Sequence, residues 1–338
     1  MMFDIRDLPL PIVGAPMAGG PSTPALAAAV SNAGGLGCLA AGYLSADRFA
    51  ADITAFRAAS SAPLGVNLFA PGPSLAVADE LTRYRRQLQP LADHYGAELG
   101  SPHSDDDGWT AKLDVVADTR PEVVSFTFAC PEPAVLARFR DLGVLTVVTV
   151  TTSAEAQIAV AAGADGLIVQ GPNAGGHRGT FDPGAFPADQ SLDELLDAVS
   201  RLGRPVVAAG GLATAEAAGA IARRGAVAAQ VGTSLLLADE AGTNAAHRAA
   251  LASADFTETV ITRAFSGRYA RGLRNDFTRR FDDVAPFGYP EVNQMTSPLR
   301  KAAVAAGDPH GTNLWAGTAF SLTKARPAAE IVTELAAR

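Results

Sequence analysis

Short apolar runs rich in β-branched residues recur along the chain, each followed by a loop and an alanine-rich stretch of helical character. This alternation is typical of βα units, which build a parallel sheet buried on both faces. Eight units predict an α/β fold of the (β/α)8 TIM-barrel type. A doubly wound sheet would have fewer strands and a G-x-G-x-x-G turn after the first. The predicted strands lie within residues 11–17, 35–42, 63–69, 123–129, 145–151, 166–171, 205–211 and 226–233.

The chain is longer than such a barrel requires. It has 338 residues, whereas a TIM barrel typically has about 250. Residues 71–120 are too long for one crossover, and residues 238–290 are more polar, with arginines between aromatic residues. We therefore predict a barrel formed by residues 1–237 and 291–338, with a small inserted α/β lid subdomain, residues 238–290, over its mouth.

Composition narrows the possible partners and location. With 27 basic and 35 acidic residues the net charge is −8, so a general attraction to nucleic acid or to anionic membrane surfaces is not expected. The chain has no uncharged apolar run of about 18 residues and no secretory signal at its start, which predicts a cytoplasmic protein. Cys38 and Cys130 are expected to be small buried residues. No metal site is expected, because the five histidines lack ligand spacing.

The loops after the seventh and eighth predicted strands carry glycines that suit an anion. Gly210, Gly211 and Gly232 allow close approach of the backbone, and a helix beginning near Thr214 directs free N–H groups the same way. These two loops form the usual phosphate site of a TIM barrel. A phosphate site alone fits sugar-phosphate isomerases, indole-forming enzymes and FMN enzymes equally well.

Polar residues at other strand ends suggest further chemistry. His177 stands in the sequence Gly-Gly-His-Arg-Gly after the sixth strand, and imidazole is suited to proton transfer near neutral pH. Asn67 and Gln170 end the third and sixth strands, and their amides can bind a ring heteroatom or a ribityl hydroxyl.

Several motifs together resemble the nitronate monooxygenases, formerly called 2-nitropropane dioxygenases, along essentially the whole chain. The Gly-Gly-His turn alone is less specific, because flavin-dependent enoyl-ACP reductases share a similar one. Another shared stretch is AFSGR followed by ARGL, at residues 264–268 and 270–273. The main motifs are GAPMAGG (14–20), GVNLF (65–69), SFTF (125–128), QGPNAGGHRG (170–179), AAGGL (208–212) with QVGT (230–233), and NLWAG (313–317).

The resemblance implies an FMN-dependent enzyme that oxidises alkyl nitronates or nitroalkanes with O2 to carbonyl compounds and nitrite. It implies that His177 is the catalytic base. Its partners would be the small-molecule substrate and O2, with a homodimer as an option. The residues it places at the cofactor are Ala15, Met17, Asn67, Gln170, Gly175, Gly176, Gly210, Gly211, Gln230, Val231, Gly232 and Thr233.

Two other functions remain open from the sequence. An FMN-dependent reductase could pass hydride from NAD(P)H to a quinone or an enoyl substrate on the same scaffold. A flavin-binding protein without turnover, or a barrel that binds another phosphate ligand, would use the same glycine loops. Anaerobic reduction by NADH or by a nitronate separates the first two functions, and a colourless protein would indicate the third.

Overall fold

Eight parallel strands form the centre of the computed structural model, which describes residues 3–337. Each predicted run contains one strand, so the predicted TIM barrel is confirmed. Their order is β1-β9-β8-β6-β5-β4-β3-β2. The strands are β1 (Ile12–Gly14), β2 (Gly37–Ala40), β3 (Leu64–Phe69), β4 (Val123–Thr127), β5 (Leu145–Val150), β6 (Gly166–Gln170), β8 (Val206–Ala209) and β9 (Ala228–Val231).

The ring closes between β1 and β2 through a single bridge. Leu36 N–H donates to Ile12 O and Gly14 N–H donates to Leu36 O, both at 2.9 Å. The strand residues are almost entirely buried, as expected where helices cover a parallel sheet. Since all eight strands are parallel, their carboxyl ends open on one face of the barrel.

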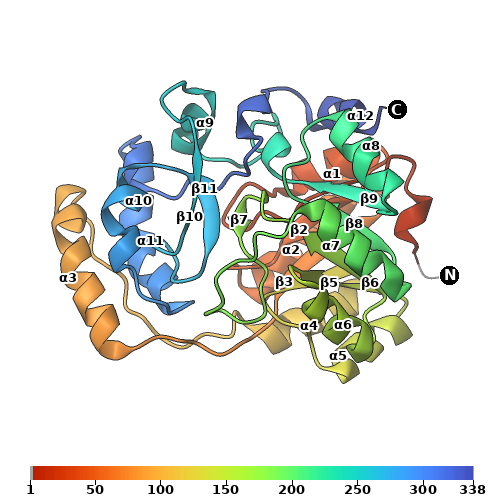
Figure 1. The fold of residues 1–338 in the computed structure, drawn as a ribbon, viewed down its shortest axis with the longest axis horizontal. Coiled ribbons are helices and arrows are strands. Elements are labelled where there is room, and N and C mark those ends of the chain that lie inside the picture. The colour runs from red at the N-terminus through yellow and green to blue at the C-terminus, as the bar shows by residue number, and fades with distance from the viewer. Residues whose placement is uncertain (1–2, 338) are drawn as a thin grey trace.

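Eight helices surround the strands (Figure 1). Their starts follow local capping chemistry: Thr23 accepts from Leu26 N–H ahead of Pro24, and Ser191 and Thr214 accept from Glu194 N–H and Ala217 N–H. The last helix packs against the first and the seventh of the ring. The helices are α1 (Pro24–Asn32), α2 (Ala46–Ala59), α4 (Trp109–Thr119), α5 (Pro133–Asp141), α6 (Ser153–Ala162), α7 (Leu192–Val199), α8 (Ala215–Arg223) and α12 (Ala328–Ala336).

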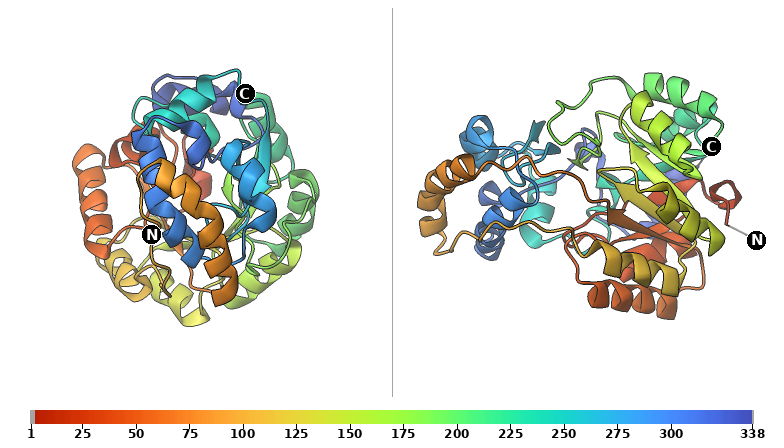
Figure 2. Two further views of the ribbon diagram at one scale, coloured as in Figure 1. Left: turned by 90° about the vertical axis from the view of Figure 1, so that its left-hand side faces the viewer. Right: turned by 90° about the horizontal axis from the view of Figure 1, so that it is seen from below.

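A second layer lies beyond the carboxyl ends of the strands, to the left of the barrel in Figure 1. Two extended segments, 70–77 and 95–107, lead from the barrel to α3 and back (Figure 2). The layer has its own apolar core, in which Tyr84, Leu88 and Leu299 are fully buried. Its elements are α3 (Ala78–His94), α9 (Ala245–Ala252), α10 (Asp276–Phe281), α11 (Glu291–Ala305), β10 (Thr259–Thr262) and β11 (Ala270–Leu273).

This packing differs from the predicted lid of residues 238–290. Helices α3 and α11 lie outside that range, yet their apolar faces meet each other and α10 in the core of the outer layer. An amphipathic helix buries its apolar face wherever the tertiary structure provides a partner, so sequence position alone did not assign these two helices to the lid.

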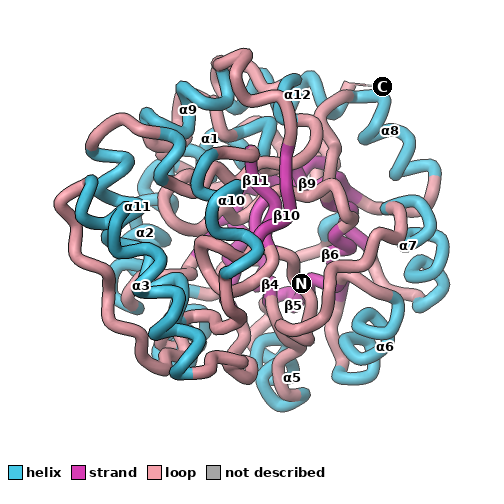
Figure 3. The backbone as a smooth tube through the Cα atoms, turned by 60° about the vertical axis from the view of Figure 1, so that its left-hand side comes forward, coloured by secondary structure: helices cyan, strands magenta, loops and turns pink. Residues whose placement is uncertain are grey.

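A three-stranded sheet joins the two layers. Strand β7 (Gly176–His177) comes from the loop after β6 and pairs antiparallel with β11, which pairs with β10. Figure 3 looks toward this sheet, with the helices of the barrel around it. The pairing carries the Gly-Gly-His turn from the barrel mouth to the lid. No helix in the described part of the chain is long and apolar enough to cross a membrane.

Candidate active site

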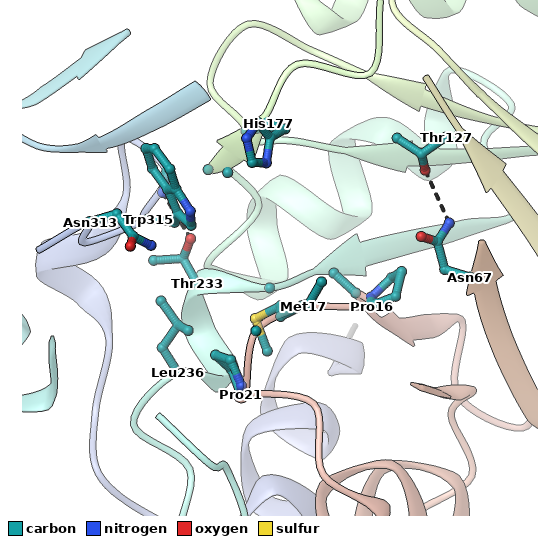
Figure 4. A pocket seen from close by; sticks show the side chains of 18 of the residues that line it. Pro16, Met17, Pro21, Asn67, Thr127, His177, Thr233, Leu236, Asn313 and Trp315 are labelled. Carbon is teal, nitrogen blue, oxygen red and sulfur yellow. Dashed lines mark hydrogen bonds between the residues drawn. The ribbon is translucent and has the colours of Figure 1, made fainter. Parts of the chain in front are cut away.

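A cavity of about 720 Å³ lies between the barrel mouth and the lid. All thirteen residues predicted to hold the cofactor or to act as the base line it. Figure 4 labels four of them, Met17, Asn67, His177 and Thr233. The eight strand ends converge there, which is why residues so distant in sequence meet. They are Ala15, Met17, Asn67, Gln170, Gly175, Gly176, His177, Gly210, Gly211, Gln230, Val231, Gly232 and Thr233.

The glycine loops after β8 and β9 form one wall of the cavity. Gly210 and Gly211 have φ of +118° and +74°, a conformation that glycine adopts without strain. A 3₁₀ turn, η3 (Thr233–Leu235), begins directly after Gly232, and the first N–H groups of a helix have no partner within it. A methyl group on Gly232 would approach the Ala15 side chain to 3.2 Å. These loops can therefore bring backbone N–H groups close to an anion.

Two amide side chains offer acceptors to a ligand. The Asn67 amide nitrogen lies 3.0 Å from Ser125 Oγ and 3.0 Å from Thr127 Oγ1, the contact drawn in Figure 4. Its donors are therefore used and the Oδ1 atom remains. The Gln230 Oε1 atom is buried and has no hydrogen-bond partner among the described residues. A ligand with N–H or O–H donors would satisfy both.

The polar atoms of Gln170 are engaged within the histidine loop. Its Nε2 donates to His177 O at 3.0 Å, and its Oε1 accepts from Gly179 N–H at 2.9 Å. The residue lines the cavity, but its amide holds backbone groups.

Ser266 determines which imidazole nitrogen of His177 is basic. The Ser266 hydroxyl lies 2.8 Å from His177 Nε2 and donates to Arg268 O at 3.1 Å. Because a hydroxyl has one proton, its oxygen then accepts from His177 Nε2–H. The Nδ1 atom is left with its lone pair and is the proton acceptor.

Aromatic rings surround His177. The ring centroids of Phe128, Tyr289 and Trp315 lie 5.8, 5.8 and 5.4 Å from the imidazole centroid. Phe128 has φ of +85°, which is strained for a residue with a side chain, and the Arg268 guanidinium lies over its ring at 4.1 Å. These walls keep the imidazole in an apolar setting.

Positive charge and burial keep His177 neutral. Burial, with the charges of Arg268 and Arg300, lowers the pKa of His177 from 6.5 to about 3. Arg300 is held by Asn313 Oδ1 and Asn293 Oδ1, each at 2.7 Å. Among the residues described, the cavity is lined by no carboxylate. The site therefore combines a neutral base with an environment that favours an anion.

Sequence reasoning assigned no role to several residues around His177. Ser266, Arg268 and Trp315 belong to motifs that the resemblance had already marked, residues 264–268 and 313–317, so a signal existed for them. Sequence reasoning gave no role to Tyr289, whose ring packs against His177, or to Arg300, which lines the cavity from α11.

Comparison with known proteins covers nearly the whole chain. The family model for nitronate monooxygenase matches residues 4–338. A nitronate monooxygenase of Pseudomonas aeruginosa is 39% identical over 338 residues, with 96% of this chain and 95% of the relative covered. One from Paraburkholderia phytofirmans is 38% identical, with 96% and 91% covered.

Solved structures agree with this similarity. A nitroalkane oxidase from Streptomyces ansochromogenes superposes with a TM-score of 0.95 at 47% identity, covering 98% of this chain and 96% of the other. FabK from Thermotoga maritima gives a TM-score of 0.74 at 26% identity, with 98% and 93% covered.

Proposed function

The chain belongs to the nitronate monooxygenase family, and on that premise we propose that it is an FMN-dependent oxidoreductase. Its reaction would be the oxidation of alkyl nitronates, or of the parent nitroalkanes, with O2 to a carbonyl compound and nitrite. The observation that carries the proposal is the cavity itself, in which His177 and the two glycine loops meet with no carboxylate among the residues described.

The residues present fit FMN. The glycine loops at Gly211 and Gly232 suit a phosphate, and the acceptors of Asn67 and Gln230 suit the N–H and hydroxyl donors of the flavin. When bound, FMN supplies the redox chemistry, accepting electrons from the substrate and passing them to O2. The protein supplies position, charge and a proton acceptor.

His177 would remove the α-proton of a neutral nitroalkane at Nδ1. Ser266 keeps the other nitrogen, Nε2, protonated and orients the ring. A nitronate that arrives as an anion needs no proton removal, so it needs the base less. The aromatic walls of Phe128 and Tyr289 exclude water from the place where the proton moves.

Arg268 and Arg300 would stabilise the negative charge that develops on the substrate as its α-proton leaves. Arg268 is buried and Arg300 is partly buried, and the charges of both lower the pKa of His177, so these charges are only partly screened by solvent. They disfavour an imidazolium when the site lacks an anion, and they stabilise the negative charge of a nitronate when it forms. A bound anion in turn offsets their effect on His177, which makes the imidazole a stronger base in the presence of its substrate.

The test compares His177→Asn with the wild-type enzyme. The variant should keep its bound flavin, lose most turnover of a neutral nitroalkane, and retain more of its turnover of the matching nitronate. Equal turnover of the nitroalkane by both proteins would contradict the assignment of the base.

A second measurement tests the reaction itself. Under anaerobic conditions a nitronate should bleach the yellow wild-type enzyme, whereas NADH should leave it oxidised. Rapid bleaching by NADH alone would instead identify a flavin reductase, and a protein that stays colourless with added FMN would refute both enzymes.

A further inference from the structure

Arg178, the residue after the proposed base, is the largest fully buried side chain in the described structure, with 1% of its surface exposed. Its Nη1 donates to Gly171 O and its Nη2 to Gln170 O. The guanidinium is thus held by two consecutive carbonyls at the end of β6. Burying this cation costs free energy that the hydrogen bonds only partly offset.

The backbone around His177 is held from three sides. Gln170 pairs with His177 O and Gly179 N–H through its side chain. On the lid side, His177 pairs with Ala270 in the β7–β11 ladder, and Arg178 N–H donates to Tyr269 O at 2.8 Å. Arg178 then ties its own side chain to the backbone of Gln170. The histidine loop is therefore fixed to the end of β6 through the side chains of both Gln170 and Arg178.

We propose that Arg178 and Gln170 are positioning residues for His177. This inference rests on the proposed function of His177 as the base. The planar guanidinium of Arg178 donates to the carbonyls of Gly171 and Gln170 at the same time. A lysine ammonium does not reproduce this two-pronged geometry. Methionine would fill a similar volume but leave both carbonyls unpaired.

The contribution of Arg178 is geometric. The charges that lower the pKa of His177 are those of Arg268 and Arg300, and Arg178 does not line the cavity. Removing its side chain should therefore change where the imidazole lies and leave the ligand contacts of the cavity in place. A displacement of about 1 Å at a reacting group can lower a rate by about 10²-fold.

The experiment compares Arg178→Met, Arg178→Lys and Gln170→Met with the wild-type enzyme. Three quantities are measured: the Kd of FMN from flavin fluorescence, and kcat and KM for a nitroalkane and for its nitronate. We expect Arg178→Met to lower kcat for the nitroalkane by about 10²-fold, with a smaller loss for the nitronate and with the Kd and KM within about threefold. Arg178→Lys should lie between Arg178→Met and the wild type. Gln170→Met should also lower the nitroalkane kcat more than the nitronate kcat.

A matched control is Arg57→Met. Arg57 also donates to a loop carbonyl, Ala62 O at 3.0 Å, but at the other end of the barrel. It should lose stability without losing kcat. A wild-type kcat in both Arg178→Met and Gln170→Met would overturn the proposal, and so would a loss of flavin affinity in proportion to kcat in Arg178→Met. If Arg178→Met does not fold, Arg178→Lys decides the outcome, and a wild-type kcat in that variant overturns the proposal.

A separate readout keeps this inference distinct from the proposed function. If the wild-type enzyme oxidises neither nitronates nor nitroalkanes, the proposed function fails. The ring ¹⁵N signals of His177 still report its tautomer and setting in that case. We expect one Nε2–H tautomer in the wild type and altered signals in Gln170→Met and Arg178→Met. Unchanged signals in both variants would show that neither residue positions the ring.

Discussion

Ser266→Ala tests the role of the hydroxyl that fixes the proton on His177. The substitution removes the acceptor 2.8 Å from His177 Nε2 and the donor 3.1 Å from Arg268 O. Ser266 is 1% exposed, so water does not readily replace it. An unpaired buried polar group costs about 1–3 kcal/mol. If that cost falls on the reacting state, kcat drops about 5-fold to 150-fold.

The loss should depend on the substrate. A nitroalkane must give its proton to His177 Nδ1, whereas a nitronate has already lost it. We therefore expect the ratio of the nitroalkane kcat to the nitronate kcat to fall by about tenfold, which corresponds to about 1.4 kcal/mol. Oxygen consumption measures both rates, and flavin absorbance shows whether the cofactor is still bound. The hydroxyl of Ser266 does not line the cavity, so the flavin content should stay constant.

Ser31→Ala is the matched control. Ser31 is 3% exposed, its hydroxyl donates to Pro63 O at 2.7 Å, and it accepts from Gly37 N–H at 2.8 Å. These groups lie at the amino ends of β2 and β3, away from the cavity. Both variants should lower the Tm, and only Ser266→Ala should change the ratio of the two rates. Equal ratios in the two variants would refute the assignment of Nδ1 as the base.

Three further outcomes follow from the structure. The pKa of His177 is lowered to about 3, so its neutral, basic form persists as the pH falls. We therefore expect kcat/KM for a nitroalkane not to decrease near pH 6.5. A decrease there would contradict the lowered pKa. Gly211→Ala should weaken FMN binding measured by fluorescence, because Gly211 lines the cavity at φ of +74°. Gly203 has a similar φ of +72° but does not line the cavity, so Gly203→Ala should leave FMN binding unchanged. Equal FMN affinity in the two variants would contradict the assignment of the phosphate to the glycine loops. Leu88→Ala should lower the free energy of unfolding by about 2–5 kcal/mol, because it empties part of the outer core, and it should speed proteolysis within residues 70–107. The control is Leu322→Ala, because Leu322 is 51% exposed and its loss should leave the cleavage rate unchanged. A wild-type cleavage rate in Leu88→Ala would contradict the packing of α3.

The barrel was predictable because its determinants are local. A strand buried on both faces requires an apolar run, and runs such as residues 145–151 and 166–171 are interrupted by helices with their own caps. The glycine loops at the barrel mouth were predictable for a related reason. A backbone that approaches an anion at positive φ requires glycine, which marks positions such as Gly210 and Gly211 in the sequence itself.

The outer layer was predicted only in part. Its arginines and aromatic residues indicated a lid, but α3 and α11 lie outside the predicted range and are separated by almost two hundred residues. An amphipathic helix shows that one face is buried without showing what covers it. Leu88, in α3, belongs to an apolar cluster of the outer layer that also contains Phe281 and Leu299, and no local pattern connects these positions.

The eight-stranded barrel could be predicted from the sequence, as could the glycine loops and the histidine at the mouth, because each depends on the residues next to it in the chain. The way His177 is used follows from contacts that form only when the chain folds. Ser266, 89 residues away, fixes its proton, Arg300 reaches its surroundings from the lid, and Arg178 folds back onto β6. Hydrogen bonds and charge act through distances of a few ångströms in space, and the lid that brings these groups together has no period in the sequence from which those distances follow.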